Sequence, residues 1–175
     1  MDAPLDDPGP GFLSPSHAGG DTDLVRVEAS VPLGLDASFA LLTDGIGRWW
    51  PAALSCAPDG TATTMAIDSR VGGRWGERTD DGDLPWGTVT LWDPPDHVRL
   101  TWTVGPDRRT PADVDTAPAS RVDVHLASVE DDLTTVIVEH RGLSAHRDPV
   151  VVRSWVGGED GWWTILRSFV AAART

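Results

Sequence analysis

The chain has 175 residues and a formal net charge of −13, with 27 acidic residues against 14 arginines. This length favours one domain with a substantial core. The acidic balance argues against binding to nucleic acid or to an anionic membrane, because phosphate contact needs a cationic face. The sequence has no Lys, Asn, Gln or Tyr, which we interpret as a high-GC coding bias. A catalytic site here would therefore lack a Schiff-base lysine, a phenol acid and a carboxamide donor.

Cys56 is the only cysteine, so the chain can form neither an internal disulfide nor a thiolate metal cluster. The first residues are acidic and include proline, unlike a cationic and apolar leader peptide. No apolar run approaches the roughly 20 residues that cross a bilayer. We expect a soluble cytoplasmic protein without a membrane partner.

Residues 1–22 are rich in Pro, Gly, Asp and Ser, and we expect a flexible acidic tail there. The ordered domain is expected over residues 23–175. It begins with Leu24–Val31, where valine and alanine alternate with polar residues as in a half-buried strand.

Two short helices are expected after this first strand. Asp36 is a candidate N-cap, and Phe39 and Leu42 continue at helical spacing. The Thr43-Asp44-Gly45 step interrupts the helical path and is a candidate cap for the second helix. Pro51 ends that helix, because proline disfavours helix in the residue before it.

From residue 61 the pattern changes to strands separated by turns. Connections this short favour antiparallel pairing, and residues 105–120 form a longer, proline-containing loop. The six expected strands are Thr61–Asp68, Gly73–Thr79, Trp86–Trp92, Val98–Val104, Arg121–Val129 and Thr134–Arg141.

The last segment is amphipathic, with Trp162, Ile165, Leu166, Phe169 and Val170 at helical spacing. A broad aromatic helix face needs a large apolar surface to cover, and the preceding strands can provide one. The order of strand, two helices, about six strands and a long helix predicts an α+β domain.

Six motifs occur along this order. They are Phe39–Asp44 leading to Trp49-Trp50, Val71–Trp75, Gly87–Pro95, Leu100–Trp102, His140–Leu143, and Gly161-Trp162 with Leu166. With these motifs the chain, from about residue 24 to 174, resembles the START-like superfamily (SRPBCC, the helix-grip or Bet v-like fold). It is most similar to the bacterial single-domain form of the family of activator of heat-shock protein 90 ATPase homologues.

The resemblance implies a curved antiparallel sheet of about six or seven strands wrapped around a long C-terminal helix. It also implies a space between sheet and helix that related proteins use for apolar small molecules. The sequence departs from the family in its acidic tail, in the expanded 105–120 loop, and in the segment 155–158 before the helix. These departures are expected at the mouth of the cavity.

Nine tryptophans supply the main candidates for a ligand site. Tryptophan offers a large rigid surface and one polar N–H, which suits a pocket wall that orients a ligand. We expect Trp75, Trp102 and Trp162, with Phe169 of the same helix, to line the cavity. Trp49 and Trp155 are expected near its opening. The alternative is that these rings only fill the core.

Arg74 and His140 are the polar candidates. Arg74 could meet a polar head group at the pocket mouth, or form an ordinary surface ion pair. His140 could act in catalysis, but a structural hydrogen bond at a strand end explains it adequately. Glu139 cannot form a dyad with His140 directly, because neighbours on a strand point to opposite faces. His125 is expected to face solvent at least in part. We predict no metal site and no cofactor, and no catalytic residue is assigned.

Three functions remain, and the first ranks highest. The first is binding of a hydrophobic small molecule for sensing, sequestration or transport. The second is an enzyme resembling the polyketide cyclases of the superfamily, which can act by holding a reactive chain in a folded shape. The third is a chaperone-associated interaction protein, discounted because eukaryotic members use an additional N-terminal domain for that work. A homodimer is left open.

Overall fold

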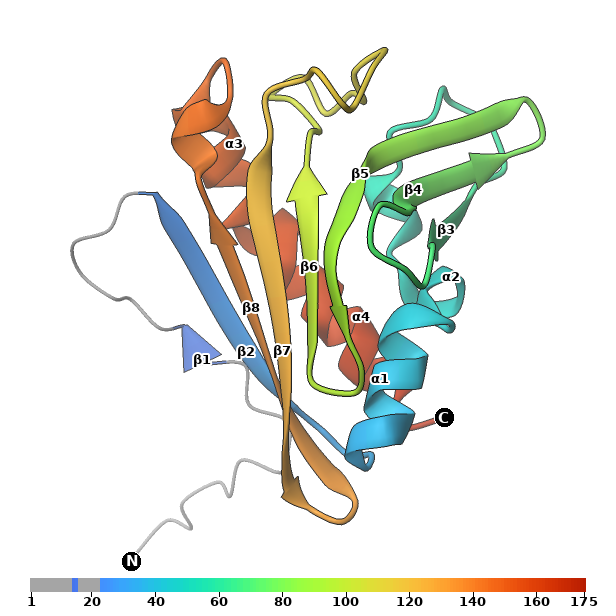
Figure 1. Cartoon of the computed structure of the whole chain (residues 1–175), viewed down its shortest axis with the longest axis vertical. Helices are drawn as coiled ribbons and strands as arrows, with labels where there is room; N and C mark the ends of the chain where they lie inside the picture. Colours follow the sequence, from blue (N-terminus) through green and yellow to red (C-terminus); the bar gives the residue numbers. More distant parts are fainter. Residues whose placement is uncertain (1–13, 16–22) are drawn as a thin grey trace, which may run out of the picture.

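The computed structural model describes residues 14–15 and 23–175 (Figure 1). The predicted tail thus lies outside the described residues except for Ser14 and Pro15, which form β1 (Ser14–Pro15) and pair with β2. The described strands build one antiparallel sheet in the order β1-β2-β8-β7-β6-β5-β4-β3.

The other strands are β2 (Leu24–Val31), β3 (Thr64–Ile67), β4 (Arg74–Thr79), β5 (Gly82–Asp93), β6 (His97–Trp102), β7 (Ser120–Glu130) and β8 (Leu133–Arg141). The helices are α1 (Leu35–Thr43), α2 (Ile46–Trp49), α3 (Pro149–Val156) and α4 (Thr164–Ala172). The sheet curves around α3 and α4, with α1 and α2 beside its other end (Figure 1). The predicted α+β helix-grip fold is confirmed.

Alternating buried side chains along the strands form the face of the sheet that packs against the C-terminal helices. Along β2 and β8 every second residue is buried, and Val27 of β2 pairs with Val138 of β8. A strand directs successive side chains to opposite faces, so this pattern gives one apolar face. Each fully buried valine of this kind contributes about 1.5–3 kcal/mol to stability.

The first helix starts differently from the prediction. Its N-cap is Gly34, and Asp36 lies within the first helical turn. The prediction that Asp36 is the cap is therefore wrong, although its negative charge still favours the helix N-terminus. A Cβ on Gly34 would lie 2.6 Å from the Asp131 carbonyl oxygen, so the β7–β8 turn packs too closely for a capping side chain. The second helix begins after Gly45 and ends before Pro51, as expected.

The C-terminal helical region consists of two helices, and the first begins earlier than the sequence indicated. This first helix, α3, has Pro149 in its first turn, and the Asp148 carboxylate accepts a hydrogen bond from the Val151 N–H at 3.4 Å. The kinked segment Glu159–Trp163 then leads into α4. Its Gly161 has a non-helical backbone (φ −106°, ψ −131°), which changes the direction of the chain between the two helices.

The loop between β6 and β7 covers the end of the sheet where α3 begins (Figure 1). Within the described residues no helix is long and apolar enough to cross a membrane.

Candidate functional site

Seven tryptophans form one connected cluster, the tryptophan cluster, between the sheet and the C-terminal helices. Its members are Trp49, Trp50, Trp75, Trp86, Trp102, Trp155 and Trp162. Trp102 of β6 lies at its centre. Its ring centroid is 5.2 Å from that of Trp86 and 5.6–5.7 Å from those of Trp75, Trp155 and Trp162. These are the tilted and edge-to-face contacts that aromatic rings prefer.

Most of the predicted ligand-binding residues come together in this region. Trp75, Trp102 and Trp162 are 1%, 1% and 4% exposed, and Trp102 contacts both of the other rings. Phe169 of α4 packs on Trp49 with centroids 4.9 Å apart. The Trp155 ring lies under the Arg108 guanidinium at 4.9 Å, next to the β6–β7 loop. Contact of these residues with a ligand remains a prediction.

Arg74 lies apart from the cluster. Its guanidinium donates to both carboxylate oxygens of Asp115, at 2.8 and 2.6 Å. This pairing raises the pKa of Arg74 and lowers the pKa of Asp115. The arrangement is the surface ion pair that the sequence left as an alternative, and it ties the β6–β7 loop to β4.

Two indole N–H groups in this region have no hydrogen-bond partner within the described residues. Both Trp50 Nε1 and Trp155 Nε1 are buried. An indole nitrogen can only donate, and a buried donor without a partner costs about 1–3 kcal/mol. Each of these two groups is therefore suited to an oxygen acceptor brought by a ligand or by water.

A chain of hydrogen bonds runs from the cluster toward the β6–β7 loop. Trp162 Nε1 donates to His140 Nδ1 at 3.1 Å. His140 Nε2 lies 2.6 Å from Ser120 Oγ, which in turn lies 2.8 Å from His146 Nε2. The three polar residues are 0%, 3% and 5% exposed. We call this set of four residues the histidine–serine relay.

Two adjacent strands, β7 and β8, and one turn position the polar residues of this relay. Ser120 begins β7 directly opposite Trp102 of β6, while His140 lies one step diagonally along β8. Gly142 then takes a left-handed conformation (φ 76°), and the chain turns away from β8 through the 3-10 turn Leu143–Ala145. Glycine adopts this backbone without steric penalty. The turn returns His146 to Ser120.

Burial favours the neutral form of both histidines. Burial, with a smaller effect of nearby His146, lowers the pKa of His140 to about 3. Burial also lowers the pKa of His146. Charging an imidazole away from water is unfavourable, so His140 is neutral at physiological pH.

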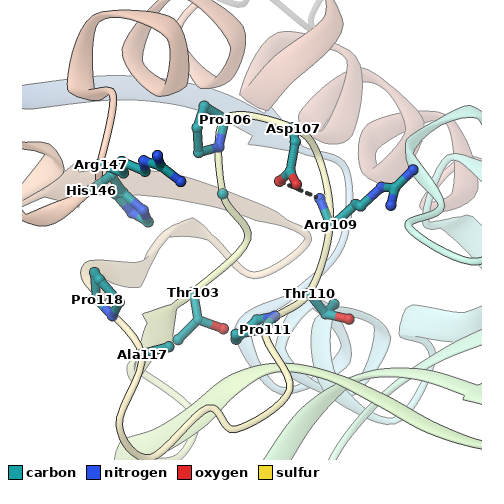
Figure 2. Close-up of a pocket in the computed structure, with 11 residues that line it drawn as sticks. Thr103, Pro106, Asp107, Arg109, Thr110, Pro111, Ala117, Pro118, His146 and Arg147 are labelled. Carbon is teal, nitrogen blue, oxygen red and sulfur yellow. Dashed lines mark hydrogen bonds between the residues drawn. The ribbon is translucent and has the colours of Figure 1, made fainter.

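A pocket of about 260 Å³ opens beside His146 under the β6–β7 loop (Figure 2). Proline rings and an alanine form apolar parts of its wall, while His146, Arg147, Arg109 and Asp107 add polar groups. None of the eight predicted ligand-binding residues lines it. The lining residues are Thr103, Gly105, Pro106, Asp107, Arg109, Thr110, Pro111, Ala117, Pro118, His146 and Arg147.

Glu77 holds the segment after α2 against the sheet. This buried carboxylate accepts hydrogen bonds from Ser55 Oγ at 2.5 Å, from the Cys56 backbone N–H at 2.6 Å and from Trp86 Nε1 at 3.1 Å. Burial, followed by the charge of Glu77, raises the pKa of the Cys56 thiol to about 12. A thiol this hard to ionise is a poor nucleophile.

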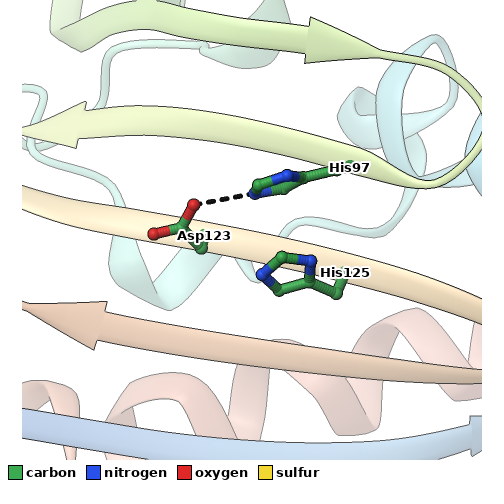
Figure 3. A group of neighbouring side chains, drawn as sticks. All are labelled: His97, Asp123 and His125. Carbon is green, nitrogen blue, oxygen red and sulfur yellow. Dashed lines mark hydrogen bonds and ion pairs between the residues drawn. The ribbon is translucent and has the colours of Figure 1, made fainter.

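On the opposite face of the sheet, His97, Asp123 and His125 lie close together (Figure 3). Asp123 accepts from His97 Nε2 and from Arg99 at 2.7 Å, and from Arg121 at 2.9 Å. The two imidazoles stack with centroids 3.9 Å apart, and one ligand atom from each of the three residues lies within 4.8 Å of the others. Both Asp123 oxygens are already paired with arginine, and the set fits an ion-pair network better than a metal centre.

The sequence alone missed three parts of these arrangements. Ser120 and Arg147 carry no local motif, and His97 was not singled out although it pairs with His125 across two strands. The sequence alone assigned no role to His146. The strand alternation around His97 and His125 was a usable signal, whereas the link from Ser120 to both histidines depends on tertiary contacts.

The curved sheet, the C-terminal helices and the aromatic interior together define a START-like, helix-grip protein. The model of the family described as "Activator of Hsp90 ATPase homolog 1-like protein" matches residues 36–174, and the chain belongs to this family. A comparison with curated proteins finds no match.

Solved structures show the same fold. The anthrahydroquino-γ-pyrone synthase Txn09 is 25% identical with a TM-score of 0.58, over 87% of this chain and 99% of that one. The self-sacrificing resistance protein CalC from Micromonospora echinospora is 24% identical with a TM-score of 0.59, over 87% and 96%. A protein from Arthrobacter aurescens is 16% identical with a TM-score of 0.60, over 92% of both chains.

Proposed function

We propose that this protein binds an apolar small molecule between its sheet and its C-terminal helices, with entry through the pocket under the β6–β7 loop. The observation that carries the proposal is the tryptophan cluster with its two unpaired indole N–H groups, Trp50 Nε1 and Trp155 Nε1. An interior that served only as a core gains nothing from buried donors without partners. A ligand that brings oxygen acceptors would satisfy both.

In this proposal the pocket is the route by which a ligand reaches the interior. The pocket lining includes Thr103, the residue after Trp102 in the sequence. It also includes His146, which is hydrogen-bonded to Ser120, the residue paired with Trp102 across the sheet. Its volume of about 260 Å³ lies slightly below the usual range for small-molecule sites, about 300–1,000 Å³. A ligand of one or two fused rings suits this space without movement of the loop.

Tryptophan fluorescence with native mass spectrometry tests the proposal. Purified protein is titrated with aromatic polyketides, two-ring ketones and fatty acids. We expect saturable changes in emission and a one-to-one complex with the aromatic ketones. A Trp155→Phe variant keeps a ring over the same contacts but lacks the unpaired N–H, and Trp92→Phe serves as its matched control away from the cluster. No saturable binding of any apolar compound would exclude this function.

An enzyme of the polyketide cyclase type is the second candidate. It is favoured by the likeness to the synthase Txn09, the structure above with 25% identity. Such an enzyme would use the aromatic interior to hold a reactive chain in a folded shape. Product analysis of the same incubations separates the two candidates, because a binding protein returns its ligand unchanged and a cyclase does not.

A further inference from the structure

The histidine–serine relay has a defined direction of hydrogen-bond donation. An indole nitrogen can only donate, so His140 Nδ1 must be the acceptor of the bond from Trp162. A neutral His140 then carries its single ring proton on Nε2, and this N–H donates to Ser120 Oγ. These proton positions follow from the bonding pattern.

The hydroxyl group of Ser120 in turn donates a hydrogen bond to His146. Its one hydroxyl proton has two acceptors within reach, His146 Nε2 at 2.8 Å and the Trp102 carbonyl oxygen at 3.4 Å. The nearer acceptor is His146. A neutral His146 that accepts at Nε2 carries its own proton on Nδ1.

The Nδ1–H of His146 is the open end of the relay. His146 lines the pocket, and its Nδ1 makes no hydrogen bond to any residue in the described part of the chain. Hydrogen bonds in such a series polarise one another, which strengthens the last donor. Arg147 and Arg109 line the same pocket, are exposed, and form no ion pair among the described residues.

We infer that His146 is a binding residue that donates a hydrogen bond from Nδ1 to a carbonyl or enolate oxygen of a ligand in this pocket. The inference rests on the proposed function and narrows its ligand to an apolar molecule with an oxygen acceptor. Arg109, Arg147 and His146 offer donors to such an oxygen, and the carboxylate of the lining, Asp107, accepts from the Arg109 backbone N–H at 3.2 Å. Ser120 and His140 are positioning residues that hold His146 in this tautomer.

A matched ligand pair tests this assignment. The probes are 1-tetralone and tetralin, which share one two-ring skeleton and differ in the ketone oxygen. We expect the protein to bind 1-tetralone about fivefold to tenfold more tightly, as one net hydrogen bond would give. The infrared carbonyl band of bound 1-tetralone should shift to lower wavenumber.

Substitutions distinguish the loss of the His146 donor from a disturbance of the surrounding fold. His146→Phe keeps an aromatic ring and removes the donor, so the preference for 1-tetralone and the band shift should both disappear. Ser120→Ala removes the relay's link and should weaken both effects, with less risk to folding. Ser154→Ala, on an exposed position of α3, is the control and should leave them unchanged.

Nitrogen NMR of the imidazole side chains tests the relay without any ligand. At neutral pH His146 is expected as the Nδ1–H tautomer and His140 as the Nε2–H tautomer, and Ser120→Ala should release the His146 preference. A His146 protonated on Nε2 would overturn the inference. Equal binding of both probes with an unshifted carbonyl band would overturn it while leaving the proposed function intact. Binding of neither probe, with the expected tautomers present, would count against the proposed function instead.

Discussion

The role of an individual side chain in this protein depends on its neighbours in space. His140 illustrates this, because its sequence context, next to Glu139 on a strand, resembles an acid/base pair. In the structure Glu139 lies on the other face with Arg26 and Arg141, whereas His140 is enclosed by Trp102, Trp162 and Ser120. The alternation of strand side chains predicted this separation correctly.

The buried His140 makes stability depend on pH. Its pKa is about 3 in the folded protein and about 6.5 in an unfolded chain, so the unfolded state binds the proton more readily. Stability is complete above pH 6.5 and falls as the pH drops from 6.5 toward 3. Between pH 6.5 and 4.5 we expect this residue alone to account for a loss of roughly 2–3 kcal/mol.

Urea unfolding at a series of pH values measures this loss. The variant His140→Gln keeps hydrogen-bonding groups but does not titrate, and its stability should vary less over the same range. His125→Gln is the control, because His125 lies only partly buried on the outer face of the sheet. Equal pH dependence of the wild type and His140→Gln would show that His140 is not the group responsible.

At the scale of secondary structure, the C-terminal helix is two helices joined at Gly161. A Cβ at this position would lie 2.3 Å from the Val156 carbonyl oxygen and 2.4 Å from that of Trp155. Both atoms belong to the backbone and cannot turn aside as a flexible side chain could. The junction therefore requires glycine for space.

We expect Gly161→Ala to lower the free energy of unfolding by about 2–4 kcal/mol, in the range of overpacked core positions. It should also displace Trp162 from His140, since the two residues are adjacent in the chain and the N–H···N bond is 3.1 Å long. Thermal and urea unfolding measure the first effect, and the His140 nitrogen shifts measure the second. Ser154→Ala, on the exposed side of α3, should change neither; a fully stable Gly161→Ala would contradict this view of the junction.

The sequence predicted the strands better than this helix. All seven longer strands were expected near their observed positions, because period-two alternation is visible over short windows. The helix α3 was missed. Its run Val150-Val151-Val152 favours a strand by propensity, although Asp148 and Pro149 are a recognisable helix start. Packing of Val152, Trp155 and Val156 into the core outweighs that local preference.

For the molecule as a whole, the tryptophan cluster joins the two layers of the fold. Trp102 comes from the sheet and touches Trp155 and Trp162 from the helices. Removal of this ring would leave a cavity at the centre of the cluster, which the surrounding rings can fill only in part.

We expect Trp102→Ala to lower the free energy of unfolding by about 3–5 kcal/mol. Trp92→Ala, at the half-buried edge where Trp92 meets Phe39, should lower it by less than half as much. Urea unfolding followed by circular dichroism measures both variants without relying on tryptophan emission. Similar losses for the two variants would mean that the cluster has no special place in the stability of the fold.

The candidate site could be predicted only in part from the sequence. The aromatic residues of the interior were identified because tryptophan content and helical spacing are local properties. The relay was not, since Ser120, His140 and His146 come from two strands and a turn, and meet only after the sheet forms. The pocket likewise depends on how residues 103–118 fold back over His146.

The sequence by itself determined the α+β order, the apolar faces of the strands and the aromatic face of the closing helix, because these follow from side-chain periodicity along the chain. Only the tertiary structure decided that seven tryptophans meet in one cluster, that Arg74 pairs with Asp115, and that His146 ends a chain of donors at a pocket. Contacts between distant segments depend on strand register and loop path, and neither leaves a periodic signal in the sequence.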